Sequence, residues 1–378
     1  MKIIVNRQEA LALAKSAESI APVKTAIEEL RCVLLEASPD NLLTMAATNI
    51  ETALERRMPA EVQESGSILL NAKLFSNMLG LLGGETVTIC GEDGGQVEIS
   101  SEDCHYVIPT MPVSDYPRAE IPFPEDTVSV KNIPLMAART VFAASENEAK
   151  PAMQCVKLVF TSDGLKAVSY DGARLAAAKG DSKGEASVSM LIPAHSLQKL
   201  SRLVTNRDEL RVGTTGKTVV FIKDNFLFSA RLLEGEHIDA DFLLESIESS
   251  FSVLTDATML YEAVSSVSVV AGEYSAVSLR FSNGRIAVGC EGEGCSSSQG
   301  LEVVALSGSP DGEYWYNPEQ LSQCLAALSG TLILEVGQNG ILVMRTDDLV
   351  CLLISRRKPV VMHQKEAKKQ KKAAKAAA

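Results

Sequence analysis

Apolar and polar positions follow a pattern that recurs three times along the chain. Each copy opens with a short alternating run, which predicts a β-strand, at residues 3–5, 128–130 and 251–253. An alanine- and leucine-rich stretch follows each run and predicts a helix, over residues 7–19, 133–145 and 256–267. Paired strands then flank a turn, and Asp163-Gly164 and Asn283-Gly284 are strong hairpin signals. We therefore predict hairpins from strands 32–37 and 42–47, 155–161 and 165–170, and 276–282 and 285–290.

The second half of each copy repeats this plan with a strand, a helix and a hairpin. The helix is clearest where Leu197, Leu200 and Leu203 recur on one face. We align with Leu197 two further helix-opening leucines, Leu74 and Leu321, each about 123 residues away. A Gly-x-x-Gly turn closes each copy, at residues 91–94, 213–216 and 337–340.

A repeat of this length is a whole domain, because solenoid repeats span only about 20–50 residues. We predict an α+β fold of three similar domains, each with two helices packed on antiparallel sheet. Linkers are expected near residues 119–127 and 245–250. The predicted domains are residues 1–122, 127–246 and 250–357, followed by a basic tail, residues 358–378, that is expected to be disordered.

Charge is unevenly distributed along the chain. The net charge is −12, yet residues 356–378 carry many lysines and arginines and a single acid, Glu366. An acidic body does not favour a protein that grips nucleic acid by net charge, so any DNA contact must use cations confined to one surface. No apolar run is long enough to span a membrane, and the N-terminus lacks a signal-peptide pattern, so we expect a cytoplasmic protein.

Residues with catalytic potential are dispersed. Eight cysteines occur without a Cys-x-x-Cys motif, and His105, His195, His237 and His363 lie far apart in the sequence. No nucleophile-elbow or Walker sequence occurs, so we expect neither catalysis nor a metal or other cofactor. His195 is expected to be a polar surface residue of a helix rather than a general base.

Several motifs lie at fixed places within the threefold repeat. The most specific is Tyr170-Asp-Gly-Ala-Arg-Leu-Ala176, and the others are Thr48-Asn-Ile-Glu51, Leu233-Glu-Gly235 and Pro109-Thr-Met-Pro-Val-Ser-Asp-Tyr-Pro117. Together they resemble motifs of the bacterial DNA polymerase III beta subunit (DNA sliding clamp) family, in which the first reads Thr-Asp-Gly-His-Arg-Leu-Ala. The resemblance extends over about residues 1–357. It implies a head-to-tail homodimeric ring that encircles duplex DNA without sequence preference. It also implies tethering of the polymerase III alpha subunit and contact with a clamp loader.

The resemblance also implies a groove between the second and third domains that binds client peptides. Its implied residues are Cys155, Tyr170, Gly172, Ala173, Arg174, Leu175, Leu243, Tyr274, Asn317, Leu352, Leu353 and Ile354. This chain departs from the family at several of the surrounding positions, namely Tyr170, Ala173, Ile238, Phe242, Gln320 and Ser355. The alternative for the Tyr170 motif is a strand ending in a turn, with Arg174 paired to a carboxylate.

For ring closure, the family positions carry over to Tyr106 and Ile108 on one strand and to Val269 and Val270 on the opposing surface. The alternative is that Tyr106 and Ile108 are ordinary core residues.

The DNA-facing cations implied by the family are Lys15, Lys24, Lys73, Arg139, Lys199 and Arg202, each of which could instead be a solvated surface residue. The third copy differs, because its two predicted helices contain no lysine or arginine.

Two questions stay open at the level of sequence. The basic tail could be a solubilising segment, could bind DNA, or could fold over the groove and compete with clients. The chain could also be a diverged clamp paralogue, with weak ring closure and a dedicated or regulatory partner, because its groove departs from the family pattern.

Overall fold

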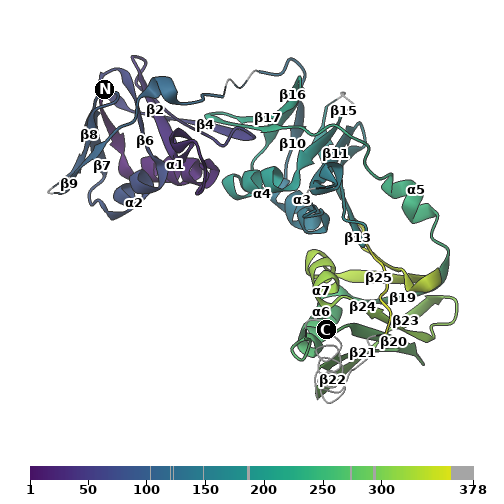
Figure 1. The fold of residues 1–378 in the computed structure, drawn as a ribbon. Coiled ribbons are helices and arrows are strands. Elements are labelled where there is room, and N and C mark those ends of the chain that lie inside the picture. Colours follow the sequence, from purple (N-terminus) through teal and green to yellow (C-terminus); the bar gives the residue numbers. More distant parts are fainter. Residues whose placement is uncertain are drawn as a thin grey trace, which may run out of the picture. The chain divides into compact units, whose positions relative to one another are not determined.

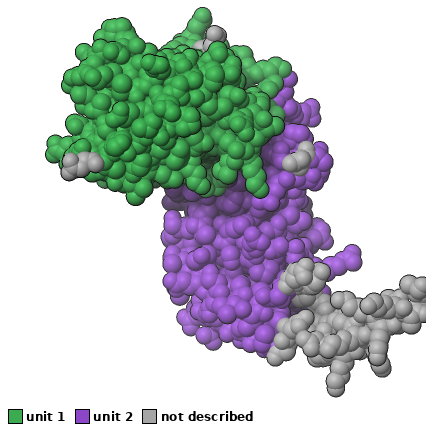
Figure 2. Space-filling view, turned by 60° about the vertical axis from the view of Figure 1, so that its left-hand side comes forward, with its two compact units in different colours: residues 1–134, 160–164, 181–233 green, residues 135–159, 165–180, 234–378 purple. Residues whose placement is uncertain are grey.

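The computed structural model describes residues 1–102, 104–119, 121, 123–147, 149–184, 188–272, 275–292 and 295–358. These residues form two compact units (Figure 2). Unit 1 contains residues 1–134, 160–164 and 181–233, and unit 2 contains residues 135–159, 165–180 and those from 234 onward. The division falls within the second repeat, so the three predicted domain ranges stay a prediction. Within the described ranges, no helix is both long and apolar enough to cross a membrane.

Unit 1 contains two antiparallel sheets (Figure 1). The smaller has the strand order β5-β1-β7-β8-β9, with bounds Glu61–Glu64, Lys2–Asn6, Thr86–Gly91, Gln96–Ser101 and Cys104–Pro109. The larger has the order β14-β10-β16-β17-β18-β4-β3-β2-β6. In that order its bounds are Ser182–Lys183, Val128–Val130, Leu210–Thr215, Thr218–Lys223, Phe226–Arg231, Thr52–Pro59, Leu42–Thr48, Cys32–Ser38 and Gly66–Asn71. Strand β15 (Val188–Pro193) also belongs to unit 1. Strand β18 of the second repeat pairs with β4 of the first, so the larger sheet joins the two repeats.

The helices of unit 1 lie on one side of its sheets (Figure 1). They are α1 (Arg7–Ile20), α2 (Ala72–Leu81) and α4 (Ala194–Leu203), with short 3-10 turns at Glu28–Arg31 and Val113–Asp115. Helices α1 and α2 pack against each other, and α1 also covers strands β2, β3 and β4. Asn6 and Asn71 begin these two helices, because each side chain accepts a hydrogen bond from a backbone N–H of the first turn.

Unit 2 also contains two antiparallel sheets. In the larger, the strands of unit 2 have the order β11-β12-β13-β27-β26-β25-β19-β23. Their bounds are Cys155–Thr161, Gly164–Tyr170, Arg174–Gly180, Leu349–Leu353, Leu342–Arg345, Thr331–Gly337, Ser249–Asp256 and Val304–Ser307. The smaller has the order β22-β21-β20-β24, with bounds Cys295–Glu302, Arg285–Gly292, Val277–Ser282 and Gly312–Tyr316. Strand β13 pairs with β27 from Arg174 opposite Leu353 to Ala178 opposite Leu349, and this pairing joins the second and third repeats.

The helices of unit 2 include one pair that corresponds to α1 and α2. Helices α6 (Ala257–Ser268) and α7 (Pro318–Ala327) pack together, and Asp256 and Asn317 cap them as Asn6 and Asn71 cap the first pair. The other helical segments are α3 (Ile133–Thr140, which starts in unit 1), α5 (Ala240–Glu245), and 3-10 turns at Val141–Ala143, Pro151–Gln154 and Gln338–Gly340.

Aromatic side chains form the core of the third repeat. The rings of Phe251 and Phe281 meet edge to face with centroids 5.0 Å apart, and Tyr314 packs against both. Tyr316 is fully buried and its hydroxyl donates to the Gly340 carbonyl at 2.9 Å, which satisfies the one polar atom of this side chain. The hydrogen bond fixes the second glycine of the third Gly-x-x-Gly turn against the sheet.

The predicted hairpins and the first helix of each copy are confirmed to within a few residues, apart from the helix predicted over 133–145, which ends at Thr140 and continues as a 3-10 turn. The second glycine of each Gly-x-x-Gly turn, Gly94, Gly216 or Gly340, has a positive φ, as the turns require.

The alignment of Leu74 with Leu197 and Leu321 is wrong by one residue. Leu74 is 43% exposed, whereas its neighbour Phe75 is fully buried, like Leu197 and Leu321. Phe75 is also the fourth residue of its helix, as the two leucines are of theirs. Leu74 precedes the buried position, which Phe75 occupies in this copy.

Candidate functional site

A groove with a volume of about 440 Å³ lies within unit 2. Six of the predicted groove residues line it: Tyr170, Gly172, Ala173, Leu243, Leu352 and Ile354. Six lining residues were missed: Ser246, Ile247, Glu248, Gln338, Asn339 and Ile341. Residues 246–248 were missed because the Glu-Ser-Ile-Glu sequence was interpreted as a linker. Residues 338–341 were missed because they belong to a turn whose glycines suggested only a hairpin.

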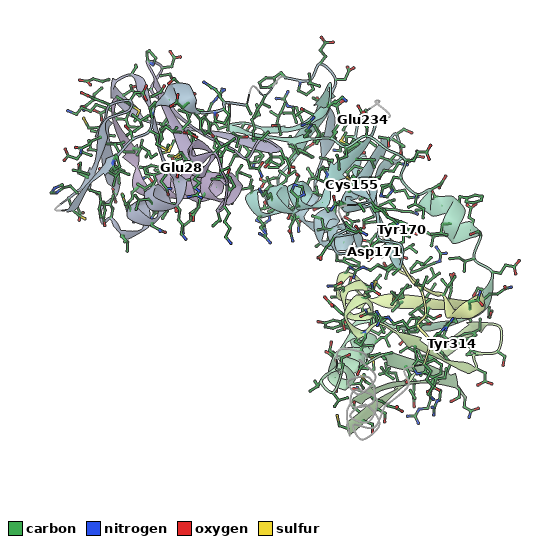
Figure 3. The ribbon with its side chains drawn as sticks, viewed as in Figure 1. Glu28, Cys155, Tyr170, Asp171, Glu234 and Tyr314 are labelled. Atoms are coloured by element: carbon green, nitrogen blue, oxygen red, sulfur yellow. The ribbon has the colours of Figure 1, made fainter. Side chains whose placement is uncertain are left out.

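One wall of the groove is the turn between β12 and β13, where Figure 3 labels Tyr170 and Asp171. The Asp171 carboxylate accepts hydrogen bonds from the backbone N–H groups of Ala173, at 2.8 Å, and Arg174, at 2.9 Å. Gly172 has a φ of +97°, which L-residues with side chains rarely adopt. The Asp-Gly pair therefore determines the path of this wall.

The floor of the groove is a buried apolar cluster. Val168, Leu175, Ala177, Val343 and Leu352 are almost fully buried, and Ala240 from α5 packs with them. Half-buried Tyr170, Leu243, Ile247 and Ile341 cover this cluster from above. The groove is thus a partly open apolar surface on a well-packed floor, which suits large apolar anchors of a bound peptide.

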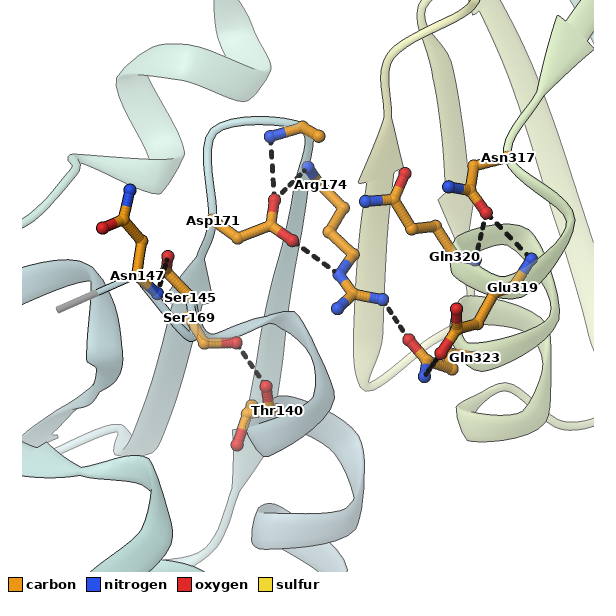
Figure 4. A network of polar contacts seen from close by, with 11 residues as sticks. Thr140, Ser145, Asn147, Ser169, Asp171, Arg174, Asn317, Glu319, Gln320 and Gln323 are labelled. Carbon is orange, nitrogen blue, oxygen red and sulfur yellow. Dashed lines mark hydrogen bonds and ion pairs between the residues drawn. The ribbon is translucent and has the colours of Figure 1, made fainter. Parts of the chain in front are cut away.

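Arg174 does not line the groove, and its side chain points toward Gln323 (Figure 4). Its Nε lies 2.9 Å from the Asp171 carboxylate, its guanidinium donates to the Gln323 side chain of α7, and it lies 5.7 Å from the centre of the Phe142 ring. Arg174 therefore ties the groove wall to helix α7 of the third repeat. This is the alternative interpretation of the motif, a turn with Arg174 paired to a carboxylate, and it coexists with a groove.

The other predicted groove residues do not line the groove. Cys155, Leu175 and Leu353 are fully buried, and burial raises the pKa of the Cys155 thiol to about 12. The Asn317 side chain caps α7 instead. Tyr274 lies outside the described residues.

The electrostatic character of the groove is acidic. Glu248 is the one charged side chain that lines it, and its carboxylate accepts a hydrogen bond from the Gln338 amide at 2.9 Å. Glu245, exposed at the end of α5, lies close by in the chain. Lysine and arginine are absent from the lining residues. Phe242 of α5, one of the departures noted in the sequence, is 74% exposed.

One predicted interface surface lies on the last strand of a sheet, and the other lies near one. Tyr106 and Ile108 are half-buried on the same face of β9, the last strand of its sheet, so they are not core residues. Val269 is 84% exposed just after α6, and Val270 approaches Gly292 of β21, whose neighbour β22 is likewise a last strand. Among the described strands, β9 and β22 thus each have one unpaired edge.

The predicted DNA-facing cations differ in how exposed they are and in whether a carboxylate pairs with them. Lys15 on α1, Lys73 on α2, Arg202 on α4 and Lys24 in the loop after α1 are exposed. Lys199 on α4 is partly buried, and this burial lowers its pKa, which the nearby Glu51 partly offsets.

Arg139 on α3 is both nearly buried and paired with a carboxylate. Its side chain is 11% exposed and lies 2.7 Å from the Asp348 carboxylate. Most of its charge is therefore compensated within unit 2.

His195 lies exposed on α4, as expected, with Nε2 3.0 Å from the Glu51 carboxylate. Over the described ranges, no three His, Cys, Asp or Glu side chains gather closely enough to hold a metal ion.

These features describe a repeat protein of paired helices on antiparallel sheet, whose candidate sites are a groove, two sheet edges and a set of helix cations. Comparison with known families agrees. A model of the DNA polymerase III beta subunit N-terminal domain matches residues 1–121, and a model of its central domain matches residues 127–239. The chain belongs to the bacterial DNA polymerase III beta-subunit family.

Curated relatives are of the same kind. The beta sliding clamp of Micrococcus luteus is 26% identical over 281 residues, covering 73% of this chain and 89% of that protein. The beta sliding clamp of Streptomyces coelicolor is 26% identical over 339 residues, covering 87% and 89%.

Solved structures share the fold at lower identity. A putative DNA polymerase III beta subunit from Eubacterium rectale matches with a TM-score of 0.88 at 20% identity, covering 94% of this chain and all of that one. The DNA polymerase sliding clamp from Bacillus subtilis matches with a TM-score of 0.88 at 21% identity, covering 95% and 100%.

Proposed function

We propose that the chain is a sliding clamp, a non-catalytic processivity factor that encircles duplex DNA as a head-to-tail homodimer in the cytoplasm. The observation that carries this proposal is that the ring-closure positions implied by the family fall on β9 in the first repeat and near β22 in the third, each the last strand of its sheet. The two edges differ in sequence, so contact between them is heterologous, and two such contacts close a ring. Apolar Tyr106, Ile108 and Val269 beside these edges supply surface to bury at the contact.

Contacts with DNA are weak in this proposal, and retention depends on the closed ring. Exposed Lys15, Lys73 and Arg202 on α1, α2 and α4 attract phosphates without fixing the ring in place. A net charge of −12 is then tolerated, because topological closure keeps the protein on DNA.

The groove is the proposed docking site for client proteins. A short peptide would place large apolar side chains over Leu243, Ile341 and Leu352. By family membership, the clients include the alpha subunit of DNA polymerase III and the clamp loader.

Retention on circular and linear DNA tests encirclement. We expect the wild-type chain, loaded by a clamp loader, to stay on nicked circular duplex through gel filtration and to leave the same DNA once it is linearised. Tyr106→Glu should abolish retention on circles, because it places a charge at the apolar ring contact. The matched control, Phe123→Glu, puts the same charge on a 65% exposed aromatic residue outside β9 and should be retained.

Equal retention on circles and linear ends would contradict encirclement. Retention of Tyr106→Glu on circles, together with an unchanged sedimentation coefficient, would contradict closure through β9.

A second candidate is a diverged clamp paralogue with a dedicated partner, favoured by the groove that lacks a cation. Two measurements separate the candidates. The sliding clamp should support processive synthesis by polymerase III, whereas the paralogue should not and should bind a different client in a peptide-binding survey.

A further inference from the structure

The groove presents uncompensated negative charge beside an apolar surface. Neither Glu248, which lines it, nor Glu245 forms an ion pair with any described residue. Two cations of the strands beside the groove are engaged elsewhere, since Lys166 of β12 pairs with Asp241 and Arg174 of β13 pairs with Asp171. The groove therefore favours a peptide that joins apolar side chains to a cation.

The chain itself leaves the groove only a few residues before the end of the described structure. Leu352 and Ile354 line the groove, and the next residues run along β24. The Arg356 backbone N–H donates to the Trp315 carbonyl at 2.6 Å, and the Lys358 ammonium lies 5.2 Å from the centre of the Trp315 ring. The segment that follows Lys358 is thus tethered four residues from a groove-lining side chain.

The sequence of that segment has the required chemistry. It begins with Pro359-Val-Val-Met362 and continues with six lysines and one acid, Glu366. Twenty residues reach up to roughly 70 Å when extended, so a return to the groove from Lys358 is well within range.

We propose that residues 359–378 occupy this groove in cis, with the Val-Val-Met run on its apolar floor and the lysines facing Glu245 and Glu248, and so compete with client peptides. The proposal rests on the proposed role of the groove as a client site. DNA is the less favoured occupant, because phosphates would use the lysines but leave the apolar run without a partner.

The tether makes even weak binding effective. A short flexible linker gives an effective concentration on the order of 1 mM. If the free segment binds with a Kd of about 0.1 mM, the tethered one would fill the groove about nine-tenths of the time and weaken a competing peptide about tenfold.

Competition in the full-length chain tests this. The probe is a fluorescein-labelled synthetic peptide of residues 359–378, titrated by fluorescence anisotropy. We expect it to bind the full-length V360D/M362D variant about tenfold more tightly than the wild type, because the tail of that variant no longer competes. Adding E245K/E248K to this variant should remove most of the binding, whereas adding E64K, an exposed acid of unit 1, should not.

Each contrary result is decisive. Failure of the probe to bind V360D/M362D at 1 mM, or equal affinity for wild type and variant, rejects occupancy in cis. Binding that survives E245K/E248K, with unchanged melting temperatures, places the contact outside the groove. If the probe binds only duplex DNA, the segment serves DNA instead. The retention assay on circular DNA is independent of all these outcomes, so failure of this inference leaves the sliding-clamp proposal intact, and the reverse also holds.

Discussion

The helix pairs of the first and third repeats have the same construction but differ in whether they carry cations. In both, an Asn or Asp side chain caps each helix, and a large apolar residue at the fourth position of the second helix is fully buried. The first pair carries Arg7, Lys15 and Lys73, whereas α6 and α7 contain no lysine or arginine.

This difference separates what determines the fold from what determines contact with DNA. Caps and buried side chains recur because each copy must form the same helices on the same sheet. Exposed positions are free to change, and in α6 they hold Met259, Tyr261 and Glu262. If both pairs face the DNA, attraction comes mainly from the first and second repeats.

Truncation of the buried helix position should have the largest effect. Phe75→Ala and Leu321→Ala should each lower the free energy of unfolding by roughly 3–5 and 2–5 kcal/mol, because each leaves a cavity in a fully packed site. Leu74→Ala should cost less than about 1 kcal/mol, since that side chain is 43% exposed. Chemical denaturation followed by circular dichroism measures all three. Equal losses at positions 74 and 75 would refute the corrected alignment.

Removal of the exposed cations should have the next largest effect. The triple variant Lys15→Gln, Lys73→Gln, Arg202→Gln should bind duplex DNA on the order of tenfold to a hundredfold more weakly at low salt. The slope of log K against log salt should become shallower by about 0.9 for each phosphate that the variant no longer neutralises.

The control for that variant is Lys131→Gln, Lys150→Gln, Lys166→Gln, which removes the same charge from other surfaces and should leave the slope nearly unchanged. Adding cations to the third repeat, as Thr258→Lys with Glu262→Lys, should steepen the slope. An unchanged slope there would mean that α6 does not face DNA.

The smallest effect is expected from pH, and it contrasts the segment before α5 with the linker before the second repeat. The segment between β18 and α5 contains His237, and burial lowers the pKa of its imidazole below the usual value. Lys157 acts in the same direction, while the backbone groups of Ile238 and Cys155 oppose it. Residues 119–127, before the second repeat, contain no histidine.

The folded state therefore binds fewer protons at His237 than the unfolded state does. Its contribution to stability is full above a pH of about 6.5 and is lost as the pH falls below that value toward the folded pKa. Melting temperatures measured between pH 7.5 and 5.5 should fall more for the wild type than for His237→Gln. Parallel pH profiles of the two proteins would contradict this expectation.

Sequence patterns predicted the elements of the fold better than the details of the groove. Alternation and Asp-Gly or Asn-Gly turns fixed the hairpins, because these signals act within a few residues. The alignment of Leu74 with Leu197 was wrong, because the sequence of two adjacent apolar residues in a helix does not show which one faces the core. Half of the groove lining came from family positions, whereas Ile247 and Ile341 meet only through contacts between segments distant in sequence. The Arg174 side chain points toward Gln323, and no local sequence pattern indicates that contact.

The pairing of β13 with β27 has a consequence for synthesis on the ribosome. Arg174 of β13 cannot pair with Leu353 of β27 until Leu353 has been synthesised, which happens much later. At about 5–20 residues per second, that delay is roughly ten to forty seconds, during which one edge of β13 is exposed. A nascent chain holding an open strand for that long is a natural substrate for chaperones, and slower translation of the third repeat should increase aggregation of the unfinished protein.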